Sequence, residues 1–351
     1  MARQGQAAVR LGDGRVLIMG GTVPFTGKCG MACTAPATAS VEIYDPGTGK
    51  FSHDGSLAEA RAGAQALLMG DGTVLVEGGG YGAPVATMEI FDPASGKSAL
   101  VKLPANVEKL PMVAAISLLA DGRVLIAGGT YDQGNSTSNV TLIFDQASGK
   151  FSDGPLMEKP RQEATATLLE DGRVLIVGGE DVRGSYGYTN FNAELIDPSK
   201  PLSRSGLIPF GGSAATLTPL SDGRVLVAGG GSYDSGAGCT TPMVPEIFDP
   251  RTERFTPVGP MSTPRSGSAS IKVQDGRVLF LGGVDANCVA AGTVEAFDPA
   301  SGTFQVISTA FPTIAFPDIA GFSATLLDDG EILIAGGGDW NMTAASWLLK
   351  P

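Results

Sequence analysis

The sequence has little of what metal and nucleophilic chemistry usually need. It contains a single histidine, His53, among 351 residues. A copper or zinc site rich in imidazole needs more than one histidine. A hydrolytic triad would have to use His53, and the sequence places no nucleophile beside it. We therefore expect no metal site, no cofactor and no catalytic role for His53.

Positive charge and long apolar runs are also scarce. The 24 Lys and Arg residues face 36 Asp and Glu residues, which gives a formal net charge of −12. Nucleic acids and anionic membranes bind basic surfaces, so neither is an expected partner. The longest apolar runs, such as residues 113–120, fall well short of the roughly 18 residues of a membrane span. Residues 1–6 lack the apolar core of a signal peptide.

What the chain has in excess is glycine. Its 50 glycines and 23 prolines accompany 43% apolar residues and a mean hydropathy of +0.14. A disordered chain has few apolar residues and a high net charge. The composition therefore indicates a folded protein with many turns.

A nine-residue phrase recurs along the whole chain. It first reads Asp-Gly-Arg-Val-Leu-Ile-Met-Gly-Gly at residues 13–21, and six further copies follow at a spacing of about 50 residues. Each copy is followed by a phrase of the type Glu-Ile-Phe-Asp-Pro, which is degenerate in the third and seventh units. The further copies of the first phrase begin at Asp71, Asp121, Asp171, Asp222, Asp275 and Asp329.

Each unit is predicted to form four short antiparallel strands. In the fourth unit the first two strands are residues 164–169 and 173–177, joined at Asp171-Gly172 by an expected type I′ turn. Residues 193–196 form the third strand, and an Asp-Pro turn leads to a fourth, such as residues 150–152 of the preceding unit. Such units cannot bury both faces alone, so they stack radially. The predicted fold is an all-β, seven-bladed β-propeller that forms one domain over residues 1–351.

The repeat resembles the kelch repeat of the galactose-oxidase-like superfamily. The resemblance rests on the paired glycines that end a strand, the Glu-Ile-Tyr/Phe-Asp-Pro phrase and the aromatic turn residue. It covers nearly the whole chain and implies the kelch-type propeller fold, but it implies no single activity. Galactose oxidase holds copper with two histidines, so the resemblance to that enzyme stops at the scaffold.

The end of the chain departs from this family, whose members usually complete one blade with strands from both termini. Here the chain opens at an expected first strand, residues 6–11, and stops after a third strand, residues 347–349. Either the last blade has three strands or the chain is a piece of a longer product, and we favour the second interpretation. In both cases the last blade is expected to lack a paired fourth strand.

The loops divide into two sets on opposite faces. The first-to-second and third-to-fourth connections are short and uniform, whereas the second-to-third loops vary, and binding usually resides on variable loops of a rigid scaffold. We expect ligand contacts to concentrate where the fourth, fifth and seventh blades meet the channel mouth. The candidate ligand-binding residues are Tyr131, Asp132, Glu180, Asp181, Arg183, Tyr186, Tyr188, Tyr233, Asp234, Asp339 and Trp340.

Many acids recur in register, which favours a structural role. The acids that follow the paired glycines are expected to cap their loops. Tyr186, Tyr188 and Trp340 do not recur in register, so a ligand role and loop packing stay equally open for them. A further set of glutamates begins the third strands and is expected to bond to backbone or to the junction arginines Arg61, Arg161 and Arg265. These glutamates are Glu42, Glu89, Glu194, Glu246 and Glu295.

All four cysteines lie in second-to-third loops. The Cys-x-x-x-Cys spacing alone is a weak metal motif, and an even number of cysteines in exposed loops indicates disulfides. Of the three connectivities, Cys29–Cys33 with Cys239–Cys288 fits best, and at least one disulfide is expected. Disulfides imply an oxidising compartment, so the sequence predicts an extracellular or cell-surface protein.

Two functions agree with these features. The first is a non-catalytic binding module that recognises a glycan or a protein through the variable loops, and the absence of a catalytic constellation favours it. The second is a carbohydrate-active enzyme, mutarotase- or lyase-like, that uses carboxylates, tyrosine and arginine at the channel mouth. Kelch-type mutarotases that act on sialic acid have six repeats, whereas this chain has seven. The ligand and the oligomeric state stay open.

Overall fold

The computed structural model shows a chain built from β-strands. It describes residues 1–24, 35–79, 85, 87–102, 114–130, 136–183, 186–190, 192–207, 213–231, 233–234, 238–239, 244–285, 287, 289–309, 321–337, 344 and 346–351, and the structural statements below concern these residues. They form 31 strands and no helix, so no helical membrane span is found among them.

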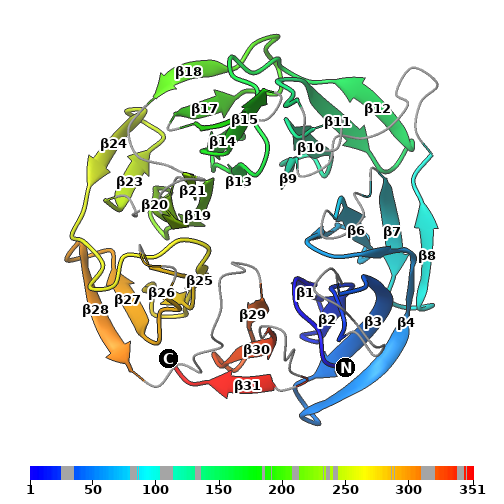
Figure 1. Ribbon diagram of the computed structural model, residues 1–351. Helices are drawn as coiled ribbons and strands as arrows, with labels where there is room; N and C mark the ends of the chain where they lie inside the picture. The colour runs from blue at the N-terminus through cyan, green and yellow to red at the C-terminus, as the bar shows by residue number, and fades with distance from the viewer. Residues whose placement is uncertain are drawn as a thin grey trace. The chain divides into compact units, whose positions relative to one another are not determined.

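Seven antiparallel sheets follow one another along the chain, and each forms one blade of a seven-bladed β-propeller (Figure 1). One compact unit, Met1–Met112 with Ala320–Pro351, holds blades 1, 2 and 7. Blade 1 contains β1 (Ala7–Arg10), β2 (Val16–Met19), β3 (Thr38–Asp45) and β4 (Lys50–Arg61). Blade 2 contains β5 (Gln65–Leu68), β6 (Val74–Glu77), β7 (Met88–Asp92) and β8 (Lys97–Leu100), and blade 7 contains β29 (Phe322–Leu326), β30 (Ile332–Gly336) and β31 (Ser346–Leu349).

The second compact unit, Val113–Ile319, holds blades 3 to 6. Blade 3 contains β9 (Ala115–Leu118), β10 (Val124–Ala127), β11 (Thr141–Asp145) and β12 (Lys150–Asp153). Blade 4 contains β13 (Thr165–Leu168), β14 (Val174–Val177), β17 (Ala193–Ile196) and β18 (Arg204–Leu207). Blade 5 contains β19 (Ser213–Pro219), β20 (Val225–Gly231), β23 (Glu246–Asp249) and β24 (Arg254–Pro257). Blade 6 contains β25 (Ala269–Lys272), β26 (Val278–Leu281), β27 (Val294–Asp298) and β28 (Thr303–Ser308).

Two of the variable loops contain short hairpins of their own. In blade 4, β15 (Glu180–Arg183) pairs with β16 (Tyr186–Thr189) between the second and third strands of the blade. In blade 5, β21 (Tyr233–Asp234) pairs with β22 (Gly238–Cys239) at the same place. Sequence reasoning treated both segments as loops, because neither has the alternation of a longer strand.

The turn between the first two strands of a blade differs from the type I′ turn that we predicted. In blade 4 the Gly172 N–H donates to the Leu169 carbonyl at 3.0 Å, and the Leu169 N–H donates to the Arg173 carbonyl at 2.8 Å. Gly172 has a φ of 86°, whereas Asp171 does not have a positive φ. Oδ1 of Asp171 accepts the Arg173 N–H at 3.1 Å. The prediction was wrong: a three-residue loop ending in a left-handed glycine replaces the two-residue turn.

The core lies between blades, because the second strand of each blade buries both of its faces. In the first unit, Leu17 and Met19 of β2 cluster with Val74 and Val76 of β6. In the second unit, Leu125 and Ala127 of β10 cluster in the same way with residues of β14. Alternate residues of one strand therefore pack against the preceding and the following blade, which explains why these strands read as continuous apolar runs.

Blade 7 has three strands in the part of the chain that the structure describes. Residues near the start of the chain do not pair with β31; Gln4 forms its bridge with Thr22 of blade 1 instead. The expectation that the last blade lacks a paired fourth strand is confirmed for the described residues.

Candidate functional site

Four buried arginines hold four of the five recurrent glutamates of the third strands. Each arginine lies four residues before the first residue of the first strand of its blade. We call each pair an arginine–glutamate clamp. The pairs are Arg3 with Glu42, Arg61 with Glu89, Arg161 with Glu194, and Arg265 with Glu295.

Blade 6 shows the contacts of a clamp. Nη2 of Arg265 donates to Glu295 Oε1 at 2.6 Å and to Thr293 Oγ1 at 2.7 Å. Nη1 donates to the carbonyls of Thr293 at 2.8 Å and of Gly282 at 3.2 Å. The side chains of Arg265 and Glu295 are both fully buried. Burial lowers the pKa of Arg265, and the charge of Glu295 opposes this effect. The expected structural role of these glutamates is confirmed for four of the five.

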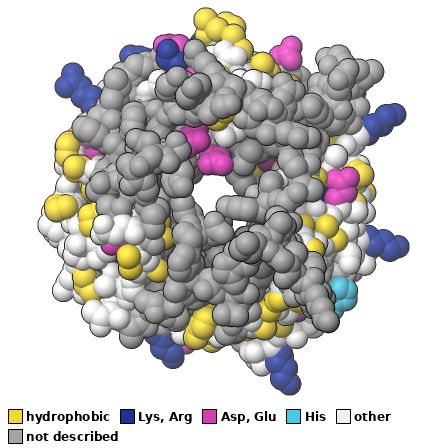
Figure 2. All heavy atoms as spheres, in the orientation of Figure 1, with side chains coloured by type: hydrophobic (Ala, Val, Ile, Leu, Met, Phe, Trp, Pro, Cys, Tyr) yellow, Lys and Arg dark blue, Asp and Glu magenta, His cyan; other side chains and the backbone are white. Residues whose placement is uncertain are grey.

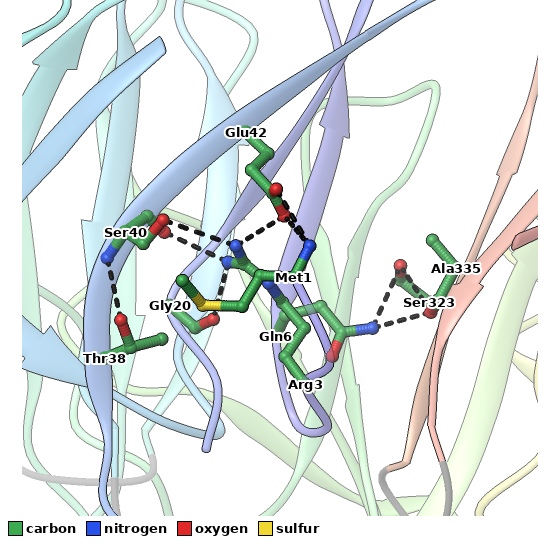
Figure 3. A network of polar contacts seen from close by, with 9 residues as sticks. All are labelled: Met1, Arg3, Gln6, Gly20, Thr38, Ser40, Glu42, Ser323 and Ala335. Atoms are coloured by element: carbon green, nitrogen blue, oxygen red, sulfur yellow. Dashed lines mark hydrogen bonds and ion pairs between the residues drawn. The ribbon is translucent and has the colours of Figure 1, made fainter. Parts of the chain in front are cut away.

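The clamp of blade 1 uses an arginine that sequence reasoning missed, because Arg3 precedes the first full repeat. Figure 3 shows Arg3 between Glu42 and the carbonyls of Gly20 and Ser40. The amino group of Met1 also pairs with Glu42, at 2.9 Å. The spacing from the arginine to the first strand is the signal that would have found this pair.

The main chain of the same arginines joins neighbouring blades. The carbonyl of Arg61 accepts the Gly21 N–H at 2.7 Å, and the carbonyl of Arg161 accepts the Gly129 N–H at 2.7 Å. The carbonyl of Arg3 accepts the Gly337 N–H at 2.9 Å. Each of these residues therefore bonds within its own blade through its side chain and to the preceding blade through its backbone.

The predicted ligand residues are described to different extents. For Tyr233, Asp234 and Cys239 the structure describes only the backbone, in which Tyr233 pairs with Cys239. It also describes only the backbone of Arg183, Tyr186 and Tyr188. The predicted disulfides therefore stay predictions, and so does the role of the fifth and seventh loops in ligand binding. The residues that lie outside the described part of the chain are Tyr131, Asp132, Asp339, Trp340, Cys29, Cys33 and Cys288.

The blade 4 hairpin brings four predicted residues into one array. Its register pairs Asp181 with Tyr188 and Arg183 with Tyr186. Since alternate residues of a strand fall on the same face, these four positions share one face of the hairpin. The sequence alone did not show this grouping, because it depends on the pairing of β15 with β16.

Asp181 anchors the hairpin to the adjacent blade. The hydroxyl of Thr137 donates to Asp181 Oδ1 at 2.9 Å, and the Val182 N–H donates to Thr137 Oγ1 at 3.2 Å. Asp181 is buried. The Asp181 carboxylate thus bonds to the loop of the neighbouring blade, whereas Asp285 of blade 6 caps its own loop, as expected, by accepting the N–H groups of Asn287 and Val289.

Two carboxylates lie at the base of this hairpin. Burial, and next the negative charge of Glu163, raises the pKa of Glu180. Glu163 has a φ of 55°, in the left-handed region. At the same position, two residues after the arginine, Gly5, Gly63 and Gly267 adopt φ values of 61°, 73° and 66°. Blade 4 therefore places an acid where the other three clamp blades use glycine, in a conformation that costs an L-residue about 1–2 kcal/mol.

We expect the Glu163→Gly substitution to raise the free energy of unfolding by about 1 kcal/mol, because glycine adopts this φ without strain. Chemical denaturation measures the difference. The Glu163→Ala variant is the matched control, since it removes the carboxylate and keeps the strain. Equal stability of the glycine and alanine variants would show that the backbone is not strained here.

The described surface offers no continuous basic patch on the face drawn in Figure 2. Its described Lys and Arg side chains stand apart from one another, and its described hydrophobic side chains form small groups. His53 is exposed on β4. None of these features marks a second candidate site on this face, so the blade 4 hairpin is the strongest candidate among the described residues.

Solved structures share this architecture. A fungal alcohol oxidase of the AA5 family, solved in complex with copper, aligns with a TM-score of 0.62 and 20% identity over 80% of this chain and 58% of its own. The structure of YjhT aligns with a TM-score of 0.61 and 13% identity over 88% of this chain and 98% of its own. The chain has a galactose-oxidase-like β-propeller fold. This chain spans less than two thirds of the length of the alcohol oxidase. No protein-family model and no curated protein matches the sequence of this chain.

An imidazole-rich copper site does not fit the part of this propeller that the structure describes. Copper sites rely on imidazole and thiolate ligands, and the one imidazole of the chain is that of His53 on β4. The described residues contain no group of three or more His, Cys, Asp or Glu side chains able to hold a metal ion. The likeness to the alcohol oxidase therefore covers the fold alone.

Proposed function

We propose that this propeller is a binding module that recognises a glycan or a protein through the variable loops around the blade 4 hairpin. The observation that carries the proposal is the register of β15 and β16, which places Arg183, Tyr186 and Tyr188 at neighbouring positions beside the buried anchor Asp181. Tyrosines offer broad, rigid contact area at a low cost in side-chain entropy. An arginine among acids supplies directional hydrogen bonds to hydroxyl, carboxylate or carbonyl groups.

Anchoring of the hairpin supports a preorganised site. The Asp181–Thr137 bond ties the hairpin to a second blade, and the Gln162 N–H donates to the Glu180 carbonyl at 2.9 Å. A surface that is fixed before the ligand arrives loses less entropy on binding. We place the module outside the cell or on its surface, because four cysteines in variable loops suit an oxidising compartment.

A second function, a carbohydrate-active enzyme, has one observation in its favour. The raised pKa of Glu180, caused by burial and by Glu163, is the kind of shift that general acids need near neutral pH. Such an enzyme would use Glu180 as acid and Arg183 with the tyrosines to orient a sugar. The binding module remains the first choice, since the enzyme rests on the direction of this one pKa shift alone.

The test is a glycan and protein array with the whole chain, followed by Arg183→Ala and Tyr188→Ala. We expect each variant to weaken binding of an array hit by about tenfold or more, with a melting temperature near that of wild type. Arg123→Ala, in an exposed turn between β9 and β10, is the matched control and should bind normally. Variants that bind every hit as wild type does would contradict the proposed site.

The enzyme is tested with the same hits. Glu180→Gln would leave a hit bound and abolish its conversion if Glu180 were the general acid, as followed by NMR of the sugar. Conversion at the wild-type rate by the Glu180→Gln variant would exclude this role, and conversion of no hit by wild type would leave the binding module as the only function.

A further inference from the structure

Blade 5 keeps the glutamate of the clamp and lacks its arginine. Glu246 occupies the register position of Glu194 and Glu295, since it pairs with Val227 as those glutamates pair with the third residue of their second strands. It is 2% exposed, and its Oε1 has no hydrogen-bond partner among the described residues. A buried carboxyl oxygen without a partner is costly, so its presence calls for a physical explanation.

The register identifies the residue that stands where the arginine would be. In blade 4 the residue after the arginine, Gln162, bridges Glu180; in blade 5, Ser213 pairs with Gly231 in the same register. Sequence position 212, directly before Ser213, therefore corresponds to Arg161. It is a glycine, so blade 5 supplies no guanidinium from this position.

In the other six blades, the clamp glutamate and the clamp arginine are either both present or both absent. In blade 3 the glutamate position is Leu142 and the arginine position is residue 111, a proline. In blade 7 the glutamate position is Trp347 and the arginine position is residue 319, an isoleucine. Blade 5 is thus the one unit whose sequence retains the acid without its base.

No cation of blade 5 replaces the missing arginine. The undescribed positions of this blade, 208–212, 232, 235–237 and 240–243, contain no lysine or arginine in the sequence. Of the described arginines of blade 5, Arg224 pairs with Asp222 and Arg251 with Asp249. Arg254 is exposed and lies opposite Asp249, at the other end of β23 from Glu246. Burial alone raises the pKa of Glu246 to about 7, with no contribution from a positive charge.

The remaining acceptors of a clamp are present in blade 5. By register, the carbonyls of Gly229 and Val244 correspond to those of Gly282 and Thr293, which accept Nη1 of Arg265. Val244 is 49% exposed, which places this end of the acceptor set at the surface. A planar fork of N–H donors matches such a set of two carbonyls and a carboxylate better than a spherical ion does.

We propose that Glu246, with the carbonyls of Gly229 and Val244, forms a binding slot for a guanidinium group from outside blade 5. The group belongs either to a small guanidinium compound or to an arginine side chain of a peptide. The four internal clamps are the template for its contacts, and the slot is independent of the ligand site at the blade 4 hairpin.

The experiment measures the melting temperature of the whole chain at about pH 8, where Glu246 is charged. We expect millimolar guanidinium chloride to raise the melting temperature of wild type in a saturable way, because a ligand that binds only the folded state stabilises it. Sodium chloride at equal ionic strength and the neutral isostere urea should not. Nα-acetyl-arginine amide distinguishes the sources: a rise with it identifies an arginine side chain, and a rise with guanidinium alone identifies a small compound.

Three variants make the result specific. Glu246→Gln should abolish the rise, and Gly212→Arg should stabilise the protein and also abolish it, because the slot is then filled from within. Arg265→Gly creates a second slot in blade 6 and should show a larger rise than wild type. The proposal is overturned if wild type responds to guanidinium no more than Gly212→Arg does, or if sodium gives the same rise.

Discussion

Replacing Glu77 with leucine is expected to raise the free energy of unfolding by roughly 3–5 kcal/mol at about pH 8. Glu77 is the last residue of β6 and is 1% exposed, and neither of its carboxylate oxygens has a hydrogen-bond partner among the described residues. Burial raises its pKa to about 8, an effect that the charge of Arg61 partly opposes. The same position is apolar in the other blades, where it holds Met19, Ala127, Val177, Ala228, Leu281 and Ala335.

The raised pKa of Glu77 makes the folded protein less stable as the pH rises. Between the ordinary pKa of 4.5 and about 8, the folded protein keeps a proton on Glu77 that the unfolded chain has released. Stability from this group is therefore full below about pH 4.5 and is lost as the pH rises through about 8. Glu246, with a pKa of about 7, acts in the same direction.

Denaturant unfolding at about pH 5.5 and pH 8 tests both statements. Wild type should lose stability across this interval, and Glu77→Leu should lose less of it, with Glu246 and Glu180 as further sources. Glu77→Gln is the control, because it removes the charge and keeps the shape and the buried polar atoms. An unchanged pH slope in both variants would show that Glu77 does not carry a shifted pKa.

Breaking one arginine–glutamate clamp should be the most damaging single change. Arg265→Met is expected to lower the free energy of unfolding by about 3–5 kcal/mol, because it leaves Glu295 buried and charged without its partner. The variant also removes the donors to the Gly282 and Thr293 carbonyls. Denaturant unfolding at neutral pH measures the loss.

Two further variants separate the clamp from an ordinary ion pair. Arg123→Met breaks the exposed Arg123–Asp121 pair, 2.7 Å apart, and should cost about 0–1 kcal/mol. The double change Arg265→Met with Glu295→Leu copies the apolar Leu142 of blade 3 and should recover most of the lost stability. A double variant as unstable as Arg265→Met would show that the uncompensated charge is not the cause.

The fold could be predicted from the sequence because each blade repeats the same local signals. The continuous apolar run in each second strand, such as residues 174–177, marks a strand buried on both faces, and the glycine pair marks its end. The expected strands at residues 173–177 and 193–196 agree with β14 and β17 to within one residue. The turn type was wrong because Asp171 lacks the positive φ of a type I′ turn, and its carboxylate accepts the backbone N–H of Arg173, a contact that the dipeptide does not reveal.

The candidate site was harder to predict, because its features arise from pairing between segments without a periodic pattern. The hairpin that aligns Asp181 with Tyr188 has no repeat in the chain that would reveal its register. The strain at Glu163 appears in the sequence only when the blades are aligned and glycine is found at the sister positions Gly5, Gly63 and Gly267. The same alignment shows that Glu246 has no clamp arginine, because blade 5 has a glycine at the arginine position, residue 212.

The double role of the clamp arginines bears on how the propeller opens. Because the Gly129 N–H bonds to the carbonyl of Arg161, blade 3 cannot separate from blade 4 without exposing an amide whose acceptor belongs to a residue buried in blade 4. Neighbouring repeats that share such bonds unfold cooperatively, and local opening becomes rare. Hydrogen exchange at Gly21 and Gly129 therefore reports the opening of a blade boundary, and exchange at interior strand amides reports the unfolding of the blade itself.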